Sequence, residues 1–399
     1  MIRLRVLLHC VTRVGIGHFV RTREIARAVA EHHDAFLVDD AAPVPDRPIH
    51  ATIKRVRIPS VIRDGGHVRP GQPGTTLGET LASRRDLLIG AARSIRPDIL
   101  TVEHFPFSKL EHRDEILPLI EAARASNRNV RVICSIRDLA PKPNYRPAGE
   151  DYRQEVLDTL HGWFDALMVH TDPRFVELSD SLDWANSIRL PLAYTGFVAE
   201  QLTRPPADGA DRKRRAGTTG PIIVSGGGRR DAGLYDSCVN AWIELNRRGH
   251  TGGRNMVLIA PAGIDPDEIV DPRLLHGSET ITVEPFSPAL IDRLNYSDLS
   301  ISQGGYNTCT NILLSGARAI LVPNRNSADQ VQRARLLAER GLCAVLDEEK
   351  LDAVDLADVI ERQLASKPRG HDLDLEGARR SVEVMEGWAT SRPTSTGCQ

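Results

Sequence analysis

The segment Val14–Arg21, VGIGHFVR, holds a histidine where it could act as a base. Gly15 and Gly17 precede His18, and Arg21 follows it one helical turn later. Glycine lets a backbone approach a ligand closely, and an imidazole with an ordinary pKa of ~6.5 accepts protons at neutral pH. We therefore predict that His18 is a general base and that Gly17 and Arg21 contact an anion or the acceptor. A structural histidine that caps the following helix is the alternative.

Two acidic residues that could orient this histidine follow strand-like apolar runs. Glu103 comes directly after PDILTV, and Asp138 comes after VRVICSIR. Ligands of open parallel sheets bind beyond the carboxyl ends of the strands, so both carboxylates are expected near His18. The predicted catalytic residues are therefore His18, Asp138 and Glu103, with Asp138 favoured as the partner of the histidine.

The same glycines could instead belong to a dinucleotide-binding loop. That fingerprint, GxGxxG, needs a third glycine for close helix packing and an acidic residue about 20 residues later. Val20 occupies the third glycine position, whereas Asp39 and Asp40 lie at a suitable distance. A Rossmann-type dehydrogenase is therefore a second alternative to the catalytic histidine.

Two glycine-rich turns in the second half of the chain could bind a diphosphate. Each follows an apolar run and leads into a helical pattern, so that backbone N–H groups and a helix dipole would face an anion. A tight strand-to-helix turn also needs glycine, and Asn307 or Thr308 could be ordinary N-caps. The predicted donor-binding residues are Gly226, Gly227 and Gly228 after IIVS, and Gln303, Gly304, Gly305 and Thr308 after DLSIS.

The segment VPNRNSADQVQ repeats this arrangement after the next apolar run. Ser327 and Gln330 have the spacing of a capping box, and Asp329 would complement the helix dipole in the first turn. Asp329 and Gln330 also offer the hydrogen-bond acceptors and donors that several sugar hydroxyls need. Both interpretations stay open, and the capping box is favoured.

Short runs of Val, Ile and Leu alternate with longer helical patterns along the chain, as in parallel sheets covered by helices on both faces. With 399 residues the chain is long enough for two such domains. We predict an α/β protein with two Rossmann-like, doubly wound parallel-sheet domains that face a cleft. The Pro- and Gly-rich segment between them places the first domain at 1–204, a linker at 205–220, the second domain at 221–385 and a tail at 386–399.

The overall charge gives no reason to expect a nucleic-acid partner. Lys plus Arg (51) nearly equals Asp plus Glu (53), and the basic run at 212–215 is interpreted as a solvated linker. Six cysteines without a CxxC pair argue against zinc and disulfides and suit a reducing cytoplasm. The acidic run DLDLE at 372–376 is interpreted as a solvated helix face, so no metal is expected. No segment has the length of a signal or a membrane span, which favours a cytoplasmic protein.

From Ile281 to Val345 the sequence resembles the C-terminal domain of GT-B glycosyltransferases, in particular those of the MurG type. The resemblance rests on EPF followed by DLSISQGGYNTCTNILLSGARAILVPNRNSADQVQRARLLAERG. The segment GIGHFVR is similar to the first loop of the same superfamily, particularly that of its PseG-type UDP-sugar hydrolases. Both halves of the chain therefore carry motifs of one superfamily.

This resemblance implies roles for residues in the second half. The glycine turns would lie against the diphosphate of the donor, Phe286 would meet its base, and Asp329 and Gln330 would hold its sugar. One position departs from the pattern. Where MurG-type enzymes carry a glutamate that holds the ribose hydroxyls, this chain has Asn311, which forms hydrogen bonds but carries no charge.

The expected function is the transfer of a sugar from a nucleotide-diphosphate sugar, UDP-linked by resemblance, to an acceptor hydroxyl. Neither a cofactor nor a metal is expected, because helix N-termini would stabilise the departing diphosphate. The partners would be the small-molecule donor and acceptor, and a peripheral membrane contact stays open. Hydrolysis of the sugar nucleotide, its epimerisation and a catalytically silent binding subunit are the alternatives, since a fold alone does not decide a function.

Overall fold

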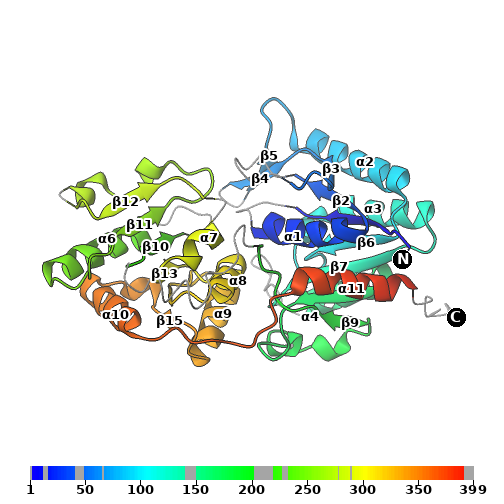
Figure 1. Cartoon of the computed structure of the whole chain (residues 1–399). Helices are drawn as coiled ribbons and strands as arrows, with labels where there is room; N and C mark the ends of the chain where they lie inside the picture. The colour runs from blue at the N-terminus through cyan, green and yellow to red at the C-terminus, as the bar shows by residue number, and fades with distance from the viewer. Residues whose placement is uncertain are drawn as a thin grey trace. The chain divides into compact units, whose positions relative to one another are not determined.

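The computed structural model divides into two units, each built on its own parallel sheet (Figure 1). The first unit contains Met1–Ala199 together with Leu373–Gln399, and the second contains Glu200–Asp372. The predicted α/β architecture with two Rossmann-like sheets is confirmed. The structure describes residues 2–11, 17–40, 49–64, 67–139, 150–201, 219–226, 232–276, 278–287 and 290–390.

The first sheet has the strand order β3-β2-β1-β6-β7-β8-β9, and every neighbouring pair is parallel. The sequence analysis misses β3, because KRVR is charged and mostly exposed, and β9, because it has only 3 residues. The strands are β1 (Arg5–His9), β2 (Asp34–Asp39), β3 (Lys54–Arg57), β6 (Ile99–Glu103), β7 (Arg131–Arg137), β8 (Ala166–His170) and β9 (Leu192–Tyr194). A separate antiparallel hairpin contains β4 (Val61–Asp64) and β5 (His67–Pro70).

Alternate residues of the central strands belong to cores on opposite faces of the first sheet. Leu7 of β1 shares a buried cluster with Leu88 of α2, whereas its neighbour Val6 shares one with Val29 of α1. Successive side chains of a strand point to opposite faces, so helices must cover both sides. The helices of this unit are α1 (Gly17–His32), α2 (Leu77–Ile95), α3 (Arg113–Ser126), α4 (Glu150–Trp163) and α11 (Gly377–Thr390).

The last helix, α11, belongs to the first unit, although the sequence analysis assigns residues up to 385 to the second domain. Val382 and Met385 are buried in the same cluster as Val29 of α1. The preceding run DLDLE is not helical, and the backbone N–H of Asp374 donates to Asp172 over 2.9 Å. Apolar periodicity predicts that a helix is half-buried but not which sheet it covers. Of the predicted linker, only residues 219–220 are among the described residues. The tail beyond residue 390 lies outside them.

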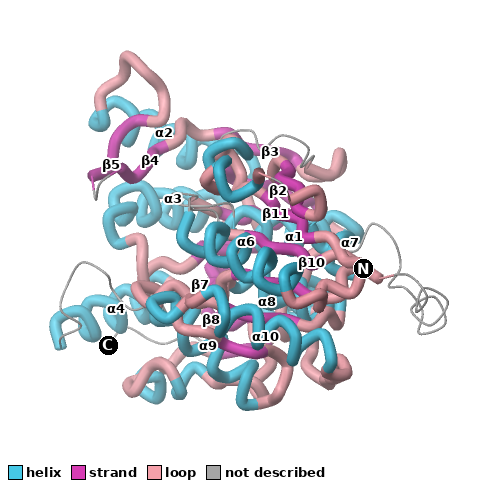
Figure 2. Tube along the Cα trace, turned by 90° about the vertical axis from the view of Figure 1, so that its left-hand side faces the viewer, coloured by secondary structure: helices cyan, strands magenta, loops and turns pink. Residues whose placement is uncertain are grey.

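The second sheet has the strand order β12-β11-β10-β13-β14-β15 and is also parallel throughout. All of its strands fall on apolar runs of the sequence, as is typical of parallel sheets covered by helices. Figure 2 shows strands in magenta among the helices in cyan. The strands are β10 (Ile222–Ser225), β11 (Met256–Ile259), β12 (Ile281–Glu284), β13 (Leu299–Ser302), β14 (Ala319–Leu321) and β15 (Ala344–Val345). The helices are α6 (Ala232–Arg247), α7 (Leu290–Asn295), α8 (Tyr306–Ser315), α9 (Ala328–Glu339) and α10 (Ala353–Ala365).

In both sheets the first strand lies where the strand order reverses. β1 lies between β2 and β6, and β10 lies between β11 and β13. Connections leave such strands towards opposite sides, which opens a crevice at their carboxyl ends where ligands bind. The segments that follow His9, Glu103, Ser225 and Ser302 therefore mark one expected ligand position in each unit.

Among the helices that the structure describes, none combines the length and the apolar character needed to cross a membrane. The cysteines in the described part of the chain are free thiols, as the absence of paired spacing predicts. Cys10, Cys134, Cys238 and Cys309 are buried and Cys343 is half-buried, while Cys398 lies outside the described residues.

Candidate active site

Glu103 is the centre of a buried cluster of charged residues at the end of β6. Its Oε1 accepts hydrogen bonds from Nδ1 of His18 at 2.8 Å and from the Arg21 guanidinium. Its Oε2 accepts a hydrogen bond from Nζ of Lys109 at 2.6 Å. Burial acts to raise the pKa of Glu103, but its interactions with His18, Lys109 and Arg21 outweigh it and hold the pKa well below its usual range. Glu103 is therefore a buried, ionised carboxylate.

The strand order explains why Glu103, and not Asp138, contacts the histidine. β6 lies beside β1, with Val102 opposite His9, so Glu103 ends next to the segment that leads to His18. Asp138 follows β7, one strand further away, and strands are spaced about 4.8 Å apart. Asp138 is fully buried and its Oδ1 accepts from the backbone N–H of Leu139 at 3.0 Å, whereas Glu103 is the carboxylate that contacts His18 at 2.8 Å. The structure thus corrects the preference for Asp138.

Two basic residues hold Glu103 in place. Arg21, expected to contact an anion or the acceptor, is only 1% exposed and faces Glu103 from the first turns of α1, which begins at Gly17. Lys109 has a left-handed backbone with φ of 64°, and its Nζ also donates to the carbonyl of Val11 at 2.9 Å. No motif of the sequence indicates Lys109, because it lies in a loop and meets Glu103 only through the fold.

His18 has one ring nitrogen committed to Glu103 and the other available to accept a proton. Because Nδ1 faces a carboxylate, it carries the hydrogen, which leaves the lone pair on Nε2. The side chain is 21% exposed, so a substrate can reach it. Burial lowers the pKa of His18 to about 3, and Glu103 acts in the opposite direction. The imidazole is therefore neutral at pH 7, and the ordinary value near ~6.5 expected from the sequence is corrected.

His18, Glu103 and His104 could in principle hold a metal ion, since their ligand atoms lie within 4.8 Å of one another. The charges around them disfavour a cation. Both oxygens of Glu103 accept hydrogen bonds from basic side chains, Arg21 and Lys109. Nε2 of His104 accepts a hydrogen bond from Nε of Arg137 at 3.2 Å. A divalent ion would have to displace these positive groups, so the arrangement suits proton transfer better than metal binding.

The acidic pair expected in a dinucleotide-binding site is engaged elsewhere. Asp39 pairs with Arg55, and Asp40 lies 3.1 Å from Arg84, whose side chain is fully buried. Nε of Arg84 also donates to Glu115 at 2.7 Å. The contacts of Arg84 join the end of β2, α2 and α3 in the interior of the unit. A ribose would need one of these carboxylates at the surface of a crevice, so the dehydrogenase alternative is disfavoured.

In the second unit the glycine turn after β10 is only partly described. The backbone N–H of Gly226 donates to the Tyr235 hydroxyl at 2.6 Å, and that hydroxyl donates to the carbonyl of Ile259 at 2.7 Å. The N–H of Gly226 is therefore used within the unit. Gly227 and Gly228 lie outside the described residues, so their contact with a diphosphate stays a prediction.

The turn after β13 packs against α9, which holds it in place. Nη1 of Arg333, which is only 1% exposed, donates to the carbonyl of Gly304 at 2.6 Å. A Cβ at Gly304 would lie 2.9 Å from the carbonyl oxygen of Gln330, so glycine is required there by close packing against α9. Gln303 is 5% exposed. Arg333 was not predicted, since an isolated arginine on an amphipathic helix carries no sequence signal.

The helix that follows this turn has no side-chain cap. The N-cap residue of α8 is Gly305, so neither Asn307 nor Thr308 caps the helix as the sequence allowed. Both side chains are half-buried instead, within the first turn. An α-helix N-terminus without a capping side chain presents partial positive charge to whatever lies before it. This end of α8 is therefore suited to an anion.

The predicted capping box of α9 is absent. Ser327 is the N-cap residue but makes no side-chain cap hydrogen bond. Oε1 of Gln330 accepts instead from the backbone N–H of Asn324 at 3.2 Å, and Asp329 lies 3.3 Å from Nη2 of Arg333. The favoured interpretation was therefore wrong, and the sugar-binding role of Asp329 and Gln330 stays a prediction.

The remaining predicted donor residues lie on neighbouring elements of the same unit. Phe286 follows β12 and is half-buried, and its contact with a nucleotide base stays a prediction. Asn311 is 2% exposed on α8, and its Nδ2 donates to Oε1 of Glu200 at 3.0 Å. Although position 311 lacks a negative charge, the fold places the carboxylate of Glu200 beside it.

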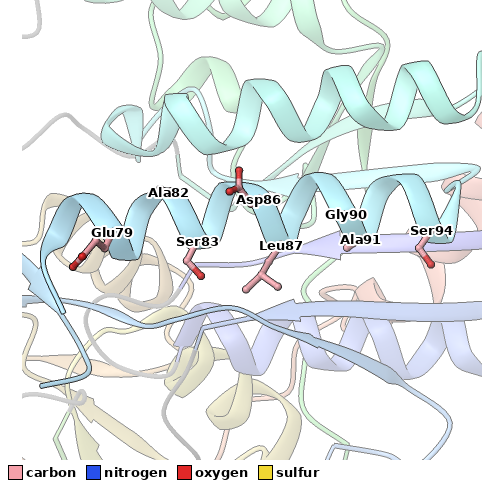
Figure 3. A pocket seen from close by; sticks show the side chains of 8 residues that line it. All are labelled: Glu79, Ala82, Ser83, Asp86, Leu87, Gly90, Ala91 and Ser94. Carbon is pink, nitrogen blue, oxygen red and sulfur yellow. The ribbon is translucent and has the colours of Figure 1, made fainter. Parts of the chain in front are cut away.

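A hollow along α2 is lined by none of these residues (Figure 3). Small side chains line most of it, and Leu87 is 44% exposed. Its lining contains no histidine, cysteine or basic residue, so it offers no group for base catalysis or phosphate binding. The lining residues are Glu79, Ala82, Ser83, Asp86, Leu87, Gly90, Ala91 and Ser94.

Buried histidines predict acid sensitivity of the first unit. Burial lowers the pKa of both His9 and His170 to about 3. The unfolded chain has the ordinary value of ~6.5, so it binds more protons than the folded chain between these two values. Each histidine should therefore reduce the free energy of unfolding by up to about 1.4 kcal/mol per pH unit as the pH falls below ~6.5.

Urea unfolding followed by circular dichroism at several pH values between 7.5 and 5.5 measures this loss. His170→Gln removes one titrating group but can still bond to Ser135 and Thr195, which contact the His170 ring at 2.7 and 2.8 Å. The variant should show a shallower dependence on pH. Equal stability of the unaltered chain at the two ends of this range would contradict the prediction.

Comparison with known proteins relates the second unit to a glycosyltransferase family. Residues 237–378 match the glycosyltransferase family 28 C-terminal domain. The UDP-N-acetylglucosamine–N-acetylmuramyl-(pentapeptide) pyrophosphoryl-undecaprenol N-acetylglucosamine transferase of Caulobacter vibrioides is 37% identical over 103 residues, which cover 25% of this chain and 28% of the relative. The protein of the same name from Aromatoleum aromaticum is 28% identical over 173 residues, which cover 42% of this chain and 46% of that relative. The matches thus span less than half the length of these curated relatives.

Solved structures relate the whole chain to glycosyltransferases by fold. A UDP-glucosyltransferase from Polygonum tinctorium superimposes with a TM-score of 0.62 over 98% of this chain and 99% of its own, at 14% identity. MurG from Acinetobacter baumannii superimposes with a TM-score of 0.57 over 96% of this chain and 99% of its own, at 12% identity. The chain therefore has the GT-B fold, and its resemblance to MurG-like glycosyltransferases is confirmed.

Proposed function

We propose that this chain is a nucleotide-sugar-dependent glycosyltransferase that uses His18 as its general base and needs no metal ion. The observation that carries the proposal is the 2.8 Å hydrogen bond between His18 and a buried, ionised Glu103 at the carboxyl end of the first sheet. A base oriented by a carboxylate is the arrangement that activates a hydroxyl. The match of residues 237–378 to a glycosyltransferase domain supports the choice of reaction.

In this reaction Nε2 of His18 takes the proton of the acceptor hydroxyl, while Glu103 stabilises the imidazolium that forms. The acceptor oxygen bonds to the anomeric carbon of the sugar as the bond from that carbon to the diphosphate oxygen breaks. The turn at 303–305 and the uncapped N-terminus of α8 would stabilise the negative charge on the departing diphosphate. Phe286 against the base and Asp329 with Gln330 on the sugar complete the proposed donor site.

UDP-N-acetylglucosamine is the first donor to test, because the names of the matched relatives specify it. The full chain is incubated with UDP-, GDP- and dTDP-linked sugars, with and without a mixture of hydroxyl acceptors, and the products are identified by mass spectrometry. We expect one nucleotide sugar to be consumed only when an acceptor is present. Release of free sugar without an acceptor would indicate a hydrolase, as the PseG-like loop allows. Conversion of the sugar while it stays attached to the nucleotide would indicate an epimerase. Binding without turnover would indicate a silent subunit.

Turnover is expected to be unchanged in excess EDTA. In this mechanism backbone N–H groups and the helix dipole stabilise the negative charge of the leaving diphosphate, so no divalent cation takes part. Initial rates are compared before and after chelation and dialysis. A loss of activity that Mg²⁺ or Mn²⁺ restores would show that the proposed stabilisation is wrong.

Gly305→Val is expected to weaken the binding of a nucleoside diphosphate by about 10-fold or more, because the side chain would stand where the diphosphate lies. The protein itself accommodates a Cβ at Gly305, whose nearest neighbour would be Oγ1 of Thr308 at 3.8 Å. Gly304→Val, in contrast, collides with the backbone of α9 and should lower the melting temperature. Calorimetric titration measures the affinities, and unchanged affinity in a folded Gly305→Val variant would remove this turn from the donor site.

A further inference from the structure

Two consecutive residues, Glu103 and His104, contact the imidazole of His18 in different ways. Glu103 accepts the hydrogen bond from Nδ1 of His18 at 2.8 Å. The His104 ring packs edge-to-face against the His18 ring, with 5.1 Å between the ring centroids and an angle of 80° between the ring planes. This is one of the arrangements that aromatic rings prefer. His104 is 1% exposed, so its ring is a buried support for a histidine that solvent can still reach.

The backbone of His104 explains how two neighbours in the sequence reach the same ring. Successive side chains of a strand point to opposite faces, so a regular continuation of β6 would turn His104 away from His18. His104 instead has a left-handed backbone, with φ of 61°, which residues other than glycine rarely adopt. Its N–H donates to the carbonyl of Ser135 at 2.9 Å, and its carbonyl accepts from the N–H of Ser108 at 2.8 Å. Strain that the surrounding structure maintains in this way clusters at functional sites.

The ring of His104 is itself fixed in orientation and in charge. Its Nε2 accepts a hydrogen bond from Nε of Arg137 at 3.2 Å, so the hydrogen of the neutral ring lies on Nδ1. Burial and the charge of Arg137 hold the pKa of His104 well below its usual range. The ring therefore carries no charge that would repel the imidazolium formed on His18, and it can support His18 in both protonation states.

We propose that His104 is a positioning residue for the general base and keeps Nε2 of His18 directed at the acceptor hydroxyl. The hydrogen bond to Glu103 fixes one atom of the His18 ring, and a ring held at one atom can still tilt about it. The packed ring of His104 removes this freedom. Orientation of a reacting group contributes strongly to rate, so a tilted base would be a poor one. The inference rests on the proposed function, because it assigns His104 a role in that reaction.

His104→Gly tests this role, because glycine adopts the left-handed backbone freely and removes the ring. The variant should lower kcat by about 10- to 100-fold and leave the donor affinity within about 2-fold. Arg96→Gly is the matched control, since exposed Arg96 also has a left-handed backbone, with φ of 51°, at the end of α2. The control should have the kcat of the unaltered chain, and circular dichroism shows whether each variant is folded.

If His104→Gly does not fold, His104→Asn replaces it in every comparison. Asparagine tolerates the left-handed backbone, and its amide oxygen can still accept a hydrogen bond from Arg137, but it has no ring to pack against His18. The expected loss of kcat is the same, because the proposed role belongs to the ring.

A double variant shows whether His104 acts through His18. In a chain that already carries His18→Ala, His104→Gly should change kcat by less than about 2-fold, because the residue that it positions is gone. An equal loss of kcat with and without His18 would overturn the inference, since His104 would then act independently of the base.

Nitrogen NMR of the histidine rings gives a measurement that needs no turnover. The signals of His18 are those that disappear in His18→Ala, and in the unaltered chain they should show a protonated Nδ1 and an unprotonated Nε2. In His104→Gly the two nitrogen shifts should move towards each other, because the loosened ring exchanges between tautomers. Arg96→Gly should leave them unchanged.

The outcomes distinguish this inference from the proposed function. Unchanged His18 signals in a folded His104→Gly variant would overturn the inference and leave the proposed function standing. If the signals respond as expected but the unaltered chain consumes no nucleotide sugar, the proposed function is overturned, while the positioning of His18 by His104 is supported.

Discussion

His18→Ala is expected to lower kcat by roughly 10²- to 10⁴-fold, the usual contribution of a positioned general base. The donor affinity should stay within about 2-fold, because the predicted donor residues all belong to the second unit. The fold should persist, since the His18 side chain is 21% exposed and Arg21 and Lys109 still pair with Glu103. Steady-state kinetics with saturating donor, together with calorimetric titration of the donor, measure both quantities.

His32→Ala is the matched control, because His32 is an exposed histidine at the other end of the same helix. It should have the kinetics of the unaltered chain. Near-normal turnover in His18→Ala would make His18 structural, and lost donor binding with intact turnover at saturation would make it a phosphate ligand.

Protonation of His18 should not reduce kcat between pH 8 and about pH 5, since burial lowers the pKa of His18 to about 3. An acidic limb near ~6.5 that disappears in His18→Ala would contradict the burial argument.

Glu103→Gln is expected to reduce the free energy of unfolding of the first unit by about 3–5 kcal/mol. The carboxylate is the shared partner of Arg21 and Lys109, which are 1% and 6% exposed. Removing its charge takes away the carboxylate that both buried cations contact, and weakening the pairing of a buried charge is among the costliest single changes. Urea unfolding at pH 7.5, followed by circular dichroism, measures the loss.

Glu31→Gln is the matched control, because Glu31 forms an exposed ion pair with Arg27 at 2.9 Å. Its effect should stay below about 1 kcal/mol. Lys109→Met removes one of the two cations, so the double variant with Glu103→Gln should lose less stability than the sum of the single variants. A loss of less than about 1 kcal/mol in Glu103→Gln would mean that Glu103 does not hold this cluster together.

The sequence was sufficient to predict the strands and turns that create both sites. Strands buried on both faces are continuous apolar runs, so the runs before Glu103 and Gln303 mark strand ends without any knowledge of packing. In an open parallel sheet these ends are where ligands bind. His18 and Glu103 were therefore found as candidates, and so was the turn at 303–305.

The sequence could not rank the two carboxylates or find the residues that support them. Asp138 and Glu103 have the same local pattern, and only the order β1-β6-β7 shows which of them is adjacent to the segment after β1. Lys109, Arg333 and Glu200 belong to no motif, because only the fold brings each of them to its partner. Glu200 lies 111 positions from Asn311, so no pattern within one segment relates them.

What the sequence by itself determined is local. It determined where strands end, where glycine opens a turn, and which polar side chains stand at those ends, because these depend on backbone preferences and on apolar patterning within a few residues. Tertiary structure alone decided which charges meet. It placed α11 on the first unit, joined Glu103 to His18, Arg21 and Lys109, and set the carboxylate of Glu200 beside Asn311. Protonation and charge pairing depend on burial and on neighbours in space, and the strand order of the folded sheets fixes both.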